Sequence, residues 1–558
     1  NGINSGSAYV FNLNRDGNFV DFEGNIYGPT GIIGTQTLDS DPVASGQLTI
    51  TDADTGEATL QAIAAGTAGD NGYGSFEVST DGAWRYTLDN TNTDVQALDD
   101  GDTLTDTITV TSADGTATQV ISVTINGADD ARTLFDVTTI SQSTGFAFTG
   151  IEAENDIGLG VQMRVANIGD FNGDGVDDFA VGAANNGPNG TSDNGAAYVV
   201  FGASGGLPAG LTPGDLNGAN GFTIPGASFG GSTGDLLGNA ITGVGDMNGD
   251  GFDDLAVSAF YGDPNGVSGR EGQAYILYGK AAPMSANVYP ATLSANEVSI
   301  ISGGNFDSEF GNDISSAGDV NGDGLDDMII STTTSNGKAY VVFGTGAALP
   351  QQFNADQIGT AIAGIEITGQ GSTGVIGNRV SGAGDLNGDG IDDLVVTEST
   401  KSNINAFDGS AYVVFGKAGL GSVNVDSLAA ADGFEFNGLD TFDGVGMTVS
   451  NAGDVNADGL DDLIIGGRSG DAFVIFGDDA ASPDWAQNRN DLDGSNGFTI
   501  KADPADSGAR MQAVSDAGDV NNDGIDDLLV STRGDAYVVY GSDTGFEAEL
   551  ELALMTAA

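Results

Sequence analysis

The stretch DLNGDGIDD, residues 385–393, decides the fold, because close copies of it occur six times along the chain. Each copy has Asp at positions 1, 5, 8 and 9, Asn at position 3 and Gly at position 6. Successive copies start 65 to 76 residues apart, a spacing that indicates a repeat architecture. The other five copies are DFNGDGVDD (170–178), DMNGDGFDD (246–254), DVNGDGLDD (319–327), DVNADGLDD (454–462) and DVNNDGIDD (519–527).

Short β-rich stretches surround every copy in the same order. A run that ends in Gly, such as 241–245, precedes the loop, and a run such as 255–257 follows it. A third run follows, as in AYVVFG (411–416), and a fourth begins Gly-Phe, as in GFEF (433–436). Four short strands with turns between them, repeated about every 70 residues, predict the blades of an all-β propeller.

The loop chemistry predicts calcium. Asp, Asn and Asp at positions 1, 3 and 5 direct oxygens toward one point, position 7 offers a backbone carbonyl, and Asp at position 9 closes the cage. Ca²⁺ takes six to eight oxygen ligands, so we predict about six structural ions, one in each loop. The predicted ligands are Asp170, Asn172, Asp174, Val176, Asp178, Asp246, Asn248, Asp250, Phe252, Asp254, Asp319, Asn321, Asp323, Leu325, Asp327, Asp385, Asn387, Asp389, Ile391, Asp393, Asp454, Asn456, Asp458, Leu460, Asp462, Asp519, Asn521, Asp523, Ile525 and Asp527.

An EF-hand is excluded, because that loop needs a bidentate Glu at position 12. Here position 12 is always apolar: Val181, Val257, Ile330, Val396, Ile465 and Val530. The first Asp of each Asp-Asp pair, such as Asp177, is not a predicted ligand. We expect it to face solvent or to brace the loop.

The charge balance limits the possible partners. The chain has 80 Asp and Glu against 15 Lys and Arg, a net charge of −65. Nucleic acids and anionic membranes bind clustered Lys and Arg, so both are excluded as partners. No apolar run approaches the ~20 residues of a membrane span. The opening, Asn1-Gly2-Ile3, shows no signal-peptide pattern, which predicts a processed chain or a fragment.

The absence of two residue types bears on chemistry. The chain contains no His and no Cys. This removes Ser-His-Asp and Cys-His catalysis, and it removes disulfides as cross-links. Bound metal is the obvious substitute, since ions that bind only the folded chain stabilise it. We predict no enzymatic activity and no catalytic residues.

Residues 38–131 lack the loop repeat and alternate apolar and polar residues instead. The alternation is clear in AWRYTL (83–88), DTITV (106–110) and QVISVTI (119–125). Period-two alternation with regular turns predicts a small immunoglobulin-like β-sandwich, with Trp84 in its core. Asp residues at predicted turns offer one further calcium site at the sandwich junction: Asp52, Asp54, Asp129 and Asp130.

The number of blades is open from the sequence. Residues 5–11 (SGSAYVF) match a third blade strand and residues 145–150 (GFAFTG) match a fourth, so the sandwich is predicted as an insertion between them. Residues 545–554 offer a fourth strand after the sixth loop. Either a seventh blade is completed by chain from elsewhere, which we favour, or six blades close alone. The predicted regions are 1–37 as blade strand and connector, 38–131 as sandwich, and 132–558 as propeller with a C-terminal strand.

The repeats resemble FG-GAP repeats, the units of the integrin α-subunit propeller and of many bacterial surface proteins. The resemblance covers roughly residues 144–545, and Phe310-Gly311 preserves the signature dipeptide. It implies that the calcium loops join the first two strands of each blade, are structural, and lie opposite the ligand-binding face. Residues 81–90 and 98–105 of the sandwich resemble a VCBS repeat, an immunoglobulin-like or cadherin-like adhesin module.

Together these features predict a secreted or cell-surface adhesion protein of bacterial type. Its expected partner is a surface glycan, a surface protein, or further copies of itself. Unpaired strands at both ends predict head-to-tail strand exchange into a filament. The alternative functions are a calcium-dependent lectin, for which Trp485 is a candidate contact, and a polysaccharide-acting enzyme.

Overall fold

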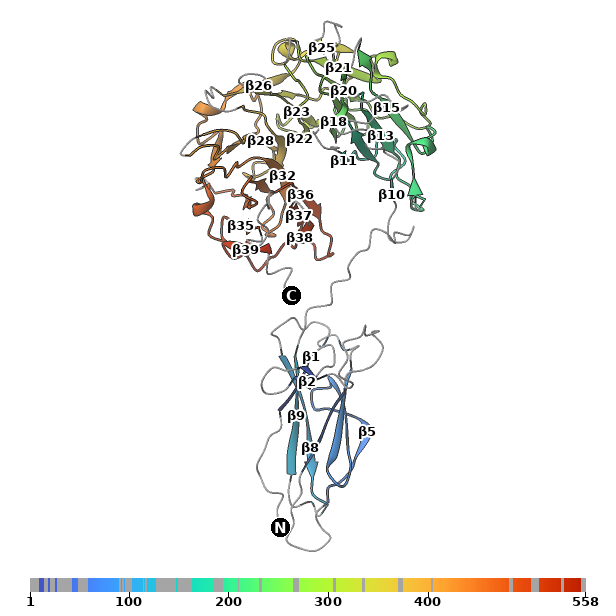
Figure 1. Cartoon of the computed structure of the whole chain (residues 1–558), viewed down its shortest axis with the longest axis vertical. Helices are drawn as coiled ribbons and strands as arrows, with labels where there is room; N and C mark the ends of the chain where they lie inside the picture. Colours follow the sequence, from blue (N-terminus) through green and yellow to red (C-terminus); the bar gives the residue numbers. More distant parts are fainter. Residues whose placement is uncertain are drawn as a thin grey trace. The chain divides into compact units, whose positions relative to one another are not determined.

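The computed structural model divides the chain into two compact units, Asn1–Asp136 and Val137–Ala557, built from β-strands and short 3₁₀ helices (Figure 1). The structure describes residues 10–14, 19–20, 26–27, 43–48, 59–89, 92, 95, 103–113, 115, 118–126, 147–148, 163–184, 194–208, 210–229, 233–263, 270–304, 308–333, 337–369, 375–402, 405–480, 485–502, 511–532 and 536–552.

Two β-sheets share one core in the N-terminal unit. Their facing side chains alternate with exposed ones, as the period-two pattern predicts: Phe76 and Trp84 from one sheet meet Val110 and Val123 from the other. Trp84 is therefore a core residue, as predicted. One sheet has the order β4 (Val43–Gln47), β7 (Ala83–Leu88), β6 (Gly74–Val78), β5 (Ile63–Ala68); the other has the order β3 (Ile26–Tyr27), β2 (Phe19–Val20), β1 (Val10–Asn14), β9 (Thr118–Asn126), β8 (Thr103–Thr111).

The sequence predicted a blade strand at residues 5–11, and the structure places the described part of it elsewhere. Residues 10 and 11 belong to β1, which pairs in parallel with β9, Val10 opposite Ser122. They therefore extend a sheet of the N-terminal unit and not a blade. The physical reason is that β9 has a free edge beyond the β8–β9 hairpin, and a free edge takes up a strand within reach. Residues 5–9 and the proposed junction ligands Asp52, Asp54, Asp129 and Asp130 lie outside the described residues.

The second unit contains six consecutive antiparallel sheets, which we call blades 1 to 6 (Figure 1). Their innermost strands lie next to one another in chain order, as in a β-propeller. The strands of blades 1 to 3 are β11 (Met163–Asn167), β12 (Phe179–Ala183), β13 (Ala196–Val200) and β15 (Gly221–Pro225); β18 (Leu237–Gly243), β19 (Leu255–Ala259), β20 (Gln273–Leu277) and β21 (Val298–Ser302); and β22 (Ile314–Gly318), β23 (Asp327–Thr332), β24 (Lys338–Val342) and β26 (Gly364–Thr368).

Blades 4 and 5 repeat this four-stranded order, and blade 6 has three described strands. The strands are β27 (Val380–Gly384), β28 (Asp393–Glu398), β29 (Ser410–Val414) and β31 (Gly433–Asn437); β32 (Thr448–Gly453), β33 (Asp462–Gly466), β34 (Ala472–Ile475) and β35 (Gly497–Lys501); and β36 (Ala513–Gly518), β37 (Asp527–Ser531) and β38 (Ala536–Val539). Neighbouring blades share their cores, so the second and third strands are buried on both faces and read as continuous apolar runs.

The outer rim joins each blade to the next. After its third strand the chain runs outward and pairs in parallel with the fourth strand of the preceding blade. The pairs are β21 with β25 (Gln352–Asn354), β26 with β30 (Val423–Asn424), and β35 with β39 (Glu549–Glu551). The strand predicted within residues 545–554 is therefore a rim strand of blade 5, and not the fourth strand of blade 6, because this rim position is used after every third strand.

β10 (Ala147–Phe148) occupies the same rim position ahead of blade 1. It pairs in parallel with β14 (Gly210–Leu211), which follows the third strand of blade 1. Phe148 stands opposite Leu211, as Ile301 stands opposite Phe353. β10 thus occupies the position of a fourth strand relative to blade 1, which is the strand type that the sequence predicted for residues 145–150.

Candidate functional site

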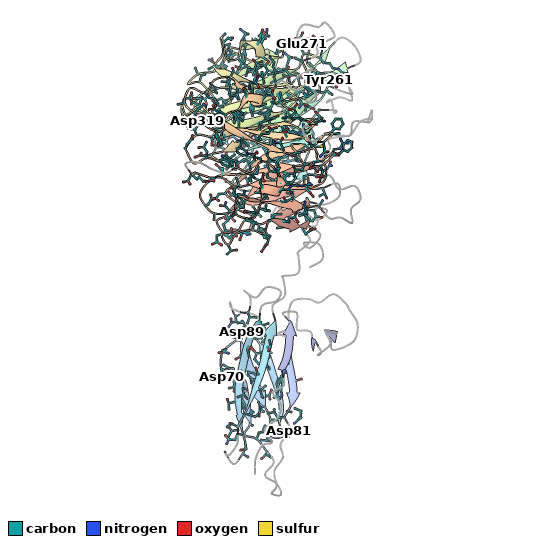
Figure 2. All side chains as sticks on the ribbon, turned by 90° about the vertical axis from the view of Figure 1, so that its left-hand side faces the viewer. Asp70, Asp81, Asp89, Tyr261, Glu271 and Asp319 are labelled. Atoms are coloured by element: carbon teal, nitrogen blue, oxygen red, sulfur yellow. The ribbon has the colours of Figure 1, made fainter. Side chains whose placement is uncertain are left out.

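Each Asp-rich loop connects the first and second strands of its blade, so all six open on one face of the ring. The connections between second and third strands, and those between blades, lie at the other end of the strands. Figure 2 views the blades edge-on and shows Asp319, from a loop, and Tyr261, from a second-to-third connection, on different faces. The unit therefore has a loop face and an opposite face.

Hydrogen bonds already shape the loops. In blade 4, Asp385 accepts from the backbone N–H of Asp389 at 3.0 Å and of Gly390 at 2.8 Å, and Asp389 accepts from the N–H of Ile391 at 3.0 Å. The other loops repeat these contacts. Positions 1 and 5 thus fold the loop into a turn with both carboxylates on it.

Position 9 anchors the loop to its own blade. The buried Asp393 accepts from the N–H of Gly416, just past the third strand, at 2.9 Å, and from the N–H of Leu386 at 3.1 Å. Asp254, Asp327, Asp462 and Asp527 accept from the corresponding groups. This anchor was not predicted from the sequence; the Gly that ends each third run, as in AYVVFG, was its signal.

Position 8 links neighbouring blades. The N–H of Asp319 at position 1 of blade 3 donates to the carboxylate of Asp392 of blade 4 at 2.7 Å. The same bond joins every adjacent pair from blade 1 to blade 6, through Asp253, Asp326, Asp461 and Asp526. The first Asp of the pair therefore braces the loop of the preceding blade, which refines the expectation that it faces solvent or braces its own loop.

The carboxylates within a loop repel one another. Burial, together with the nearby carboxylates at positions 1 and 5, raises the pKa of Asp254, Asp393 and Asp462 to about 8, against the hydrogen bonds from backbone N–H groups. The same causes raise the pKa of Asp327 to about 7 and that of Asp178 to about 6. A bound divalent cation would relieve this repulsion and favour the charged carboxylates.

The oxygen-rich chemistry of the loops fits a hard cation, although the carboxylates of a loop do not point toward one common centre. The buried Oδ1 of Asn248, at position 3 of blade 2, accepts no hydrogen bond, and a side-chain carbonyl is a calcium ligand. In blades 1, 3 and 4 the Asn at position 3 donates to the carboxylate at position 9 instead. Within the described residues no three carboxylates form a metal-holding group. The thirty predicted ligands are thus brought together loop by loop, without forming a closed cage.

Two stacked aromatic side chains are exposed on the opposite face. Phe407 lies between β28 and β29, and Phe442 lies between β31 and β32. Their rings stack with centroids 5.6 Å apart and planes 12° from parallel, and they are 42% and 50% exposed. Both residues have positive φ, 57° and 69°, a region that bulky residues rarely adopt. Neither residue was predicted as a site; the repeated Phe-Asp-Gly at 407–409 and 442–444 was the available signal.

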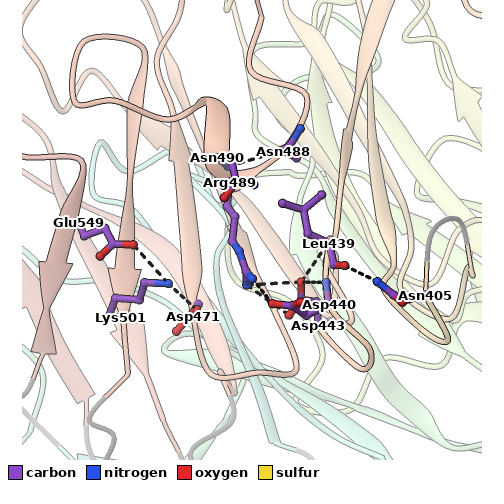
Figure 3. Close-up of polar contacts among 10 residues, drawn as sticks. All are labelled: Asn405, Leu439, Asp440, Asp443, Asp471, Asn488, Arg489, Asn490, Lys501 and Glu549. Atoms are coloured by element: carbon purple, nitrogen blue, oxygen red, sulfur yellow. Dashed lines mark hydrogen bonds and ion pairs between the residues drawn. The ribbon is translucent and has the colours of Figure 1, made fainter.

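A buried carboxylate shapes the Phe442 loop, and backbone hydrogen bonds join this loop to the Phe407 loop. Asp443 accepts from the N–H groups of Leu439 and Asp440, and Gly444 donates its N–H to the carbonyl of Phe407 at 3.1 Å. Figure 3 shows Arg489 pointing toward Asp440 and Asp443. The strained conformation of the Phe residues is therefore maintained by a rigid network.

Trp485, the candidate lectin contact, is partly buried and packs against the core between blades 4 and 5. Its ring stacks on Phe434 with centroids 4.6 Å apart and planes at 6°, and it also packs near Phe415. A side chain packed in this way anchors the connection between β34 and β35.

Comparison with known proteins agrees with this geometry. Residues 165–200, 238–277 and 310–342, which form the inner three strands of blades 1 to 3, match the FG-GAP repeat. The second unit is a β-propeller, and its first three blades are similar to this repeat. The chain is 27% identical over 219 residues to integrin alpha-PS5 of Drosophila melanogaster, covering 38% of this chain and 19% of that protein. It is 26% identical over 252 residues to integrin alpha pat-2 of Caenorhabditis elegans, covering 43% and 19%.

A third relative is an enzyme. Phosphatidylinositol-glycan-specific phospholipase D of Dictyostelium discoideum is 30% identical over 183 residues, which are 30% of this chain and 18% of the enzyme. The chain thus spans about a fifth of the length of each of these relatives. Among solved structures, the Dos1 propeller aligns with 89% of this chain and 79% of its own, at 10% identity and a TM-score of 0.32.

Proposed function

We propose that the chain is an extracellular adhesion protein whose propeller is stabilised by calcium and binds its ligand on the face opposite the loops. The integrin-like repeats support an adhesion or interaction role. The single observation that carries the ligand site is the exposed Phe407–Phe442 stack, because a strained backbone kept by a rigid network is typical of functional positions. The surface location and bacterial type rest on the family resemblance.

The chemistry of this stack favours a glycan. A flat, exposed aromatic surface fits the apolar face of a sugar ring, and the ion pair of Arg489 with Asp440, a residue of the Phe442 loop, offers hydrogen-bonding groups for hydroxyls. Calcium would be held by the loop oxygens at positions 1, 3, 5, 7 and 9, where it supplies positive charge among repelling carboxylates. In this proposal its role is structural, and the ligand does not touch it.

An enzymatic function receives no support from the described residues. The loop carboxylates already serve as hydrogen-bond anchors, and the chain contains no His. The shared 183 residues are a small part of the phospholipase D, so its activity does not transfer to this chain. Strand exchange into a filament is not part of this proposal, since the described residues of β1 and β39 pair within their own chain.

The test is a glycan array, followed by titration of the best ligand in saturating calcium. A Phe407→Gly/Phe442→Gly variant removes both rings, and Gly tolerates the positive φ, so the fold is kept. We expect binding to weaken at least about tenfold while the melting temperature stays the same or rises. Tyr289→Ala, at an exposed aromatic elsewhere in the unit, is the matched control and should bind normally. Unchanged binding by the double variant would place the ligand site elsewhere.

Among the described residues, no helix has the length and apolar character needed to cross a bilayer.

A further inference from the structure

Three loops of blades 4 and 5 meet on the face opposite the Asp-rich loops. They are the Phe407 loop (405–409, between β28 and β29), the Phe442 loop (439–444, between β31 and β32) and the Arg468 loop (467–471, between β33 and β34). Backbone hydrogen bonds join each loop to the next. The N–H of Gly444 donates to the carbonyl of Phe407 at 3.1 Å, and the N–H of Arg468 donates to the carbonyl of Asp443 at 2.6 Å. The three loops therefore form one connected surface.

The exposed side chain of Arg468 lies against the aromatic stack. Its guanidinium carbon is 5.7 Å from the centroid of the Phe442 ring, which in turn stacks on Phe407. A Cβ at Gly444, where φ is 55°, would lie 2.7 Å from Cβ of Arg468, so only Gly lets the two loops approach this closely. A contact with a ring uses none of the five N–H donors of a guanidinium. These donors remain available to a ligand.

The charge of Arg468 is not neutralised by any residue that the structure describes. No ion pair joins Arg468 to a described carboxylate, although the chain has 80 Asp and Glu, and Arg468 is the only Lys or Arg on the three loops. The acidic residues of the three loops have other partners (Figure 3): the N–H of Asn405 for Asp408, Arg489 for Asp440 and Asp443, and Lys501 for Asp471. An uncompensated cation beside an exposed aromatic stack is suited to an anionic group on a ring-shaped ligand.

A similar contact in blade 2 differs in one respect. Cζ of Arg270 lies 4.2 Å from the centroid of the Tyr261 ring, which, like Arg468, belongs to a connection between second and third strands. However, a guanidinium nitrogen of Arg270 lies 3.6 Å from a carboxylate oxygen of Glu309. The charge of Arg270 is thus compensated, whereas that of Arg468 is available for binding.

The combination of rings and one guanidinium favours an acidic sugar. Arg donates two parallel N–H groups to an oxyanion such as a carboxylate, and the stack packs on the sugar ring. Nucleic acids and anionic membranes carry closely spaced charges and need clustered cations, whereas a sugar with one charged group needs one. The surface as a whole, at a net charge of −65, repels acidic polymers. An acidic glycan is therefore held only where such a cation is displayed.

We propose that this surface selects acidic glycans. The ring of a uronic acid or of a sulfated sugar packs on Phe407 and Phe442, and its carboxylate or sulfate accepts N–H donors from Arg468. This inference rests on the proposed glycan site and adds the class of glycan and the residue that recognises it. Gly444 positions Arg468 by allowing the two loops to approach.

The test compares acidic oligosaccharides with neutral forms of the same sugars. Short galacturonic acid oligomers are printed beside their methyl esters, and sulfated galactose oligomers beside their desulfated forms, so that the two pairs distinguish a carboxylate from a sulfate. The wild type, Arg468→Gln and Arg270→Gln are assayed in saturating calcium. Arg270→Gln is the matched control, because it also removes a guanidinium from an aromatic ring, but one whose charge is paired.

We expect the wild type to bind at least one acidic form at least about tenfold more tightly than its neutral form, as for hydrogen bonds to a charged group. Arg468→Gln should bind the two forms equally, and Arg270→Gln should keep the full preference. Both Arg variants should keep the melting temperature of the wild type, since surface substitutions of this kind change stability little.

The outcomes separate this inference from the glycan site on which it rests. Equal binding of acidic and neutral forms by the wild type, lost in Phe407→Gly/Phe442→Gly, would overturn the acidic preference and leave the glycan site in place. An acidic preference that survives in Arg468→Gln would overturn the role of Arg468, since another group would then bind the charge. Binding to neither acidic form would also contradict the inference. Unchanged binding by the double Phe variant would remove the glycan site and this inference together.

Discussion

At the residue scale, Asp392 and Asp177 occupy position 8 of their loops but differ in one contact. Asp392 accepts from the N–H of Asp319 in the preceding blade, and Asp177 has no such partner among the described residues. Removing one side of a hydrogen bond to a charged group costs about 1.5–3 kcal/mol. We expect Asp392→Ala to lower the free energy of unfolding by about that amount, measured from urea unfolding in calcium.

Asp177→Ala is the control for this comparison. An exposed side chain without a partner should change stability by no more than about 0.5 kcal/mol. Equal losses in the two variants would show that the bond between blades contributes nothing and that position 8 acts only within its own loop.

The position-9 carboxylates predict an unusual pH dependence. Burial raises the pKa of Asp254, Asp393 and Asp462 to about 8, above the unfolded value of 3.8, so the calcium-free folded state binds more protons than the unfolded state. Its stability should therefore fall as pH rises between about 4 and 8. Calcium competes with these protons and should reverse the trend. Melting curves of calcium-depleted and calcium-saturated protein at about pH 6 and pH 8 measure both slopes; parallel slopes would contradict calcium binding at position 9.

At the element scale, the following blade leaves no room for a side chain at the Gly that ends the first strand of a blade. Gly384 has φ of 66°, and a Cβ there would lie 2.3 Å from Cγ of Asp461 in the next blade; Gly518 has φ of 61° and open space. Gly518→Ala should cost about 1 kcal/mol for the left-handed backbone alone. Gly384→Ala should cost clearly more, because the blades must move apart. Thermal unfolding of the two variants compares the costs, and equal shifts in melting temperature would mean that the interface adapts freely.

Much of this architecture could be predicted from sequence, because the residues that shape a blade lie close together in the sequence and recur in every repeat. The apolar runs, the turn Gly and the loop Asp predicted the strand order of a blade and the loop position, and period-two alternation predicted the core role of Trp84. Long-range pairing was not predictable in this way. Residues 10–11 and 549–551 have strand composition, but their partners are whichever free edges lie nearby, β9 and β35. Likewise, exposure of Phe407 and Phe442 depends on how two distant loops meet, which residue types do not encode.

At the scale of the whole molecule, calcium should separate the behaviour of the two units. The six Asp-rich loops all lie in the second unit, and none lies in the described part of the first. An ion that binds only the folded state stabilises by about 2.7 kcal/mol per site at a hundredfold excess over Kd. The chain has two Trp residues, Trp84 packed in the first unit and Trp485 packed in the second, so each unit has its own fluorescent reporter.

We therefore expect chelation to lower the melting temperature reported by Trp485 in a Trp84→Phe variant. The transition reported by Trp84 in a Trp485→Phe variant should not move. Asp389→Ala, which removes one loop carboxylate, should lower the first transition in calcium by only part of the effect of chelation, since five loops keep their ligands. If neither transition moves on chelation, the turns seen in each loop, such as Asp385 bonded to Gly390, hold the blades by hydrogen bonds alone. In that case the high pKa of the position-9 carboxylates has no cation to lower it, and the loops are structural turns without metal.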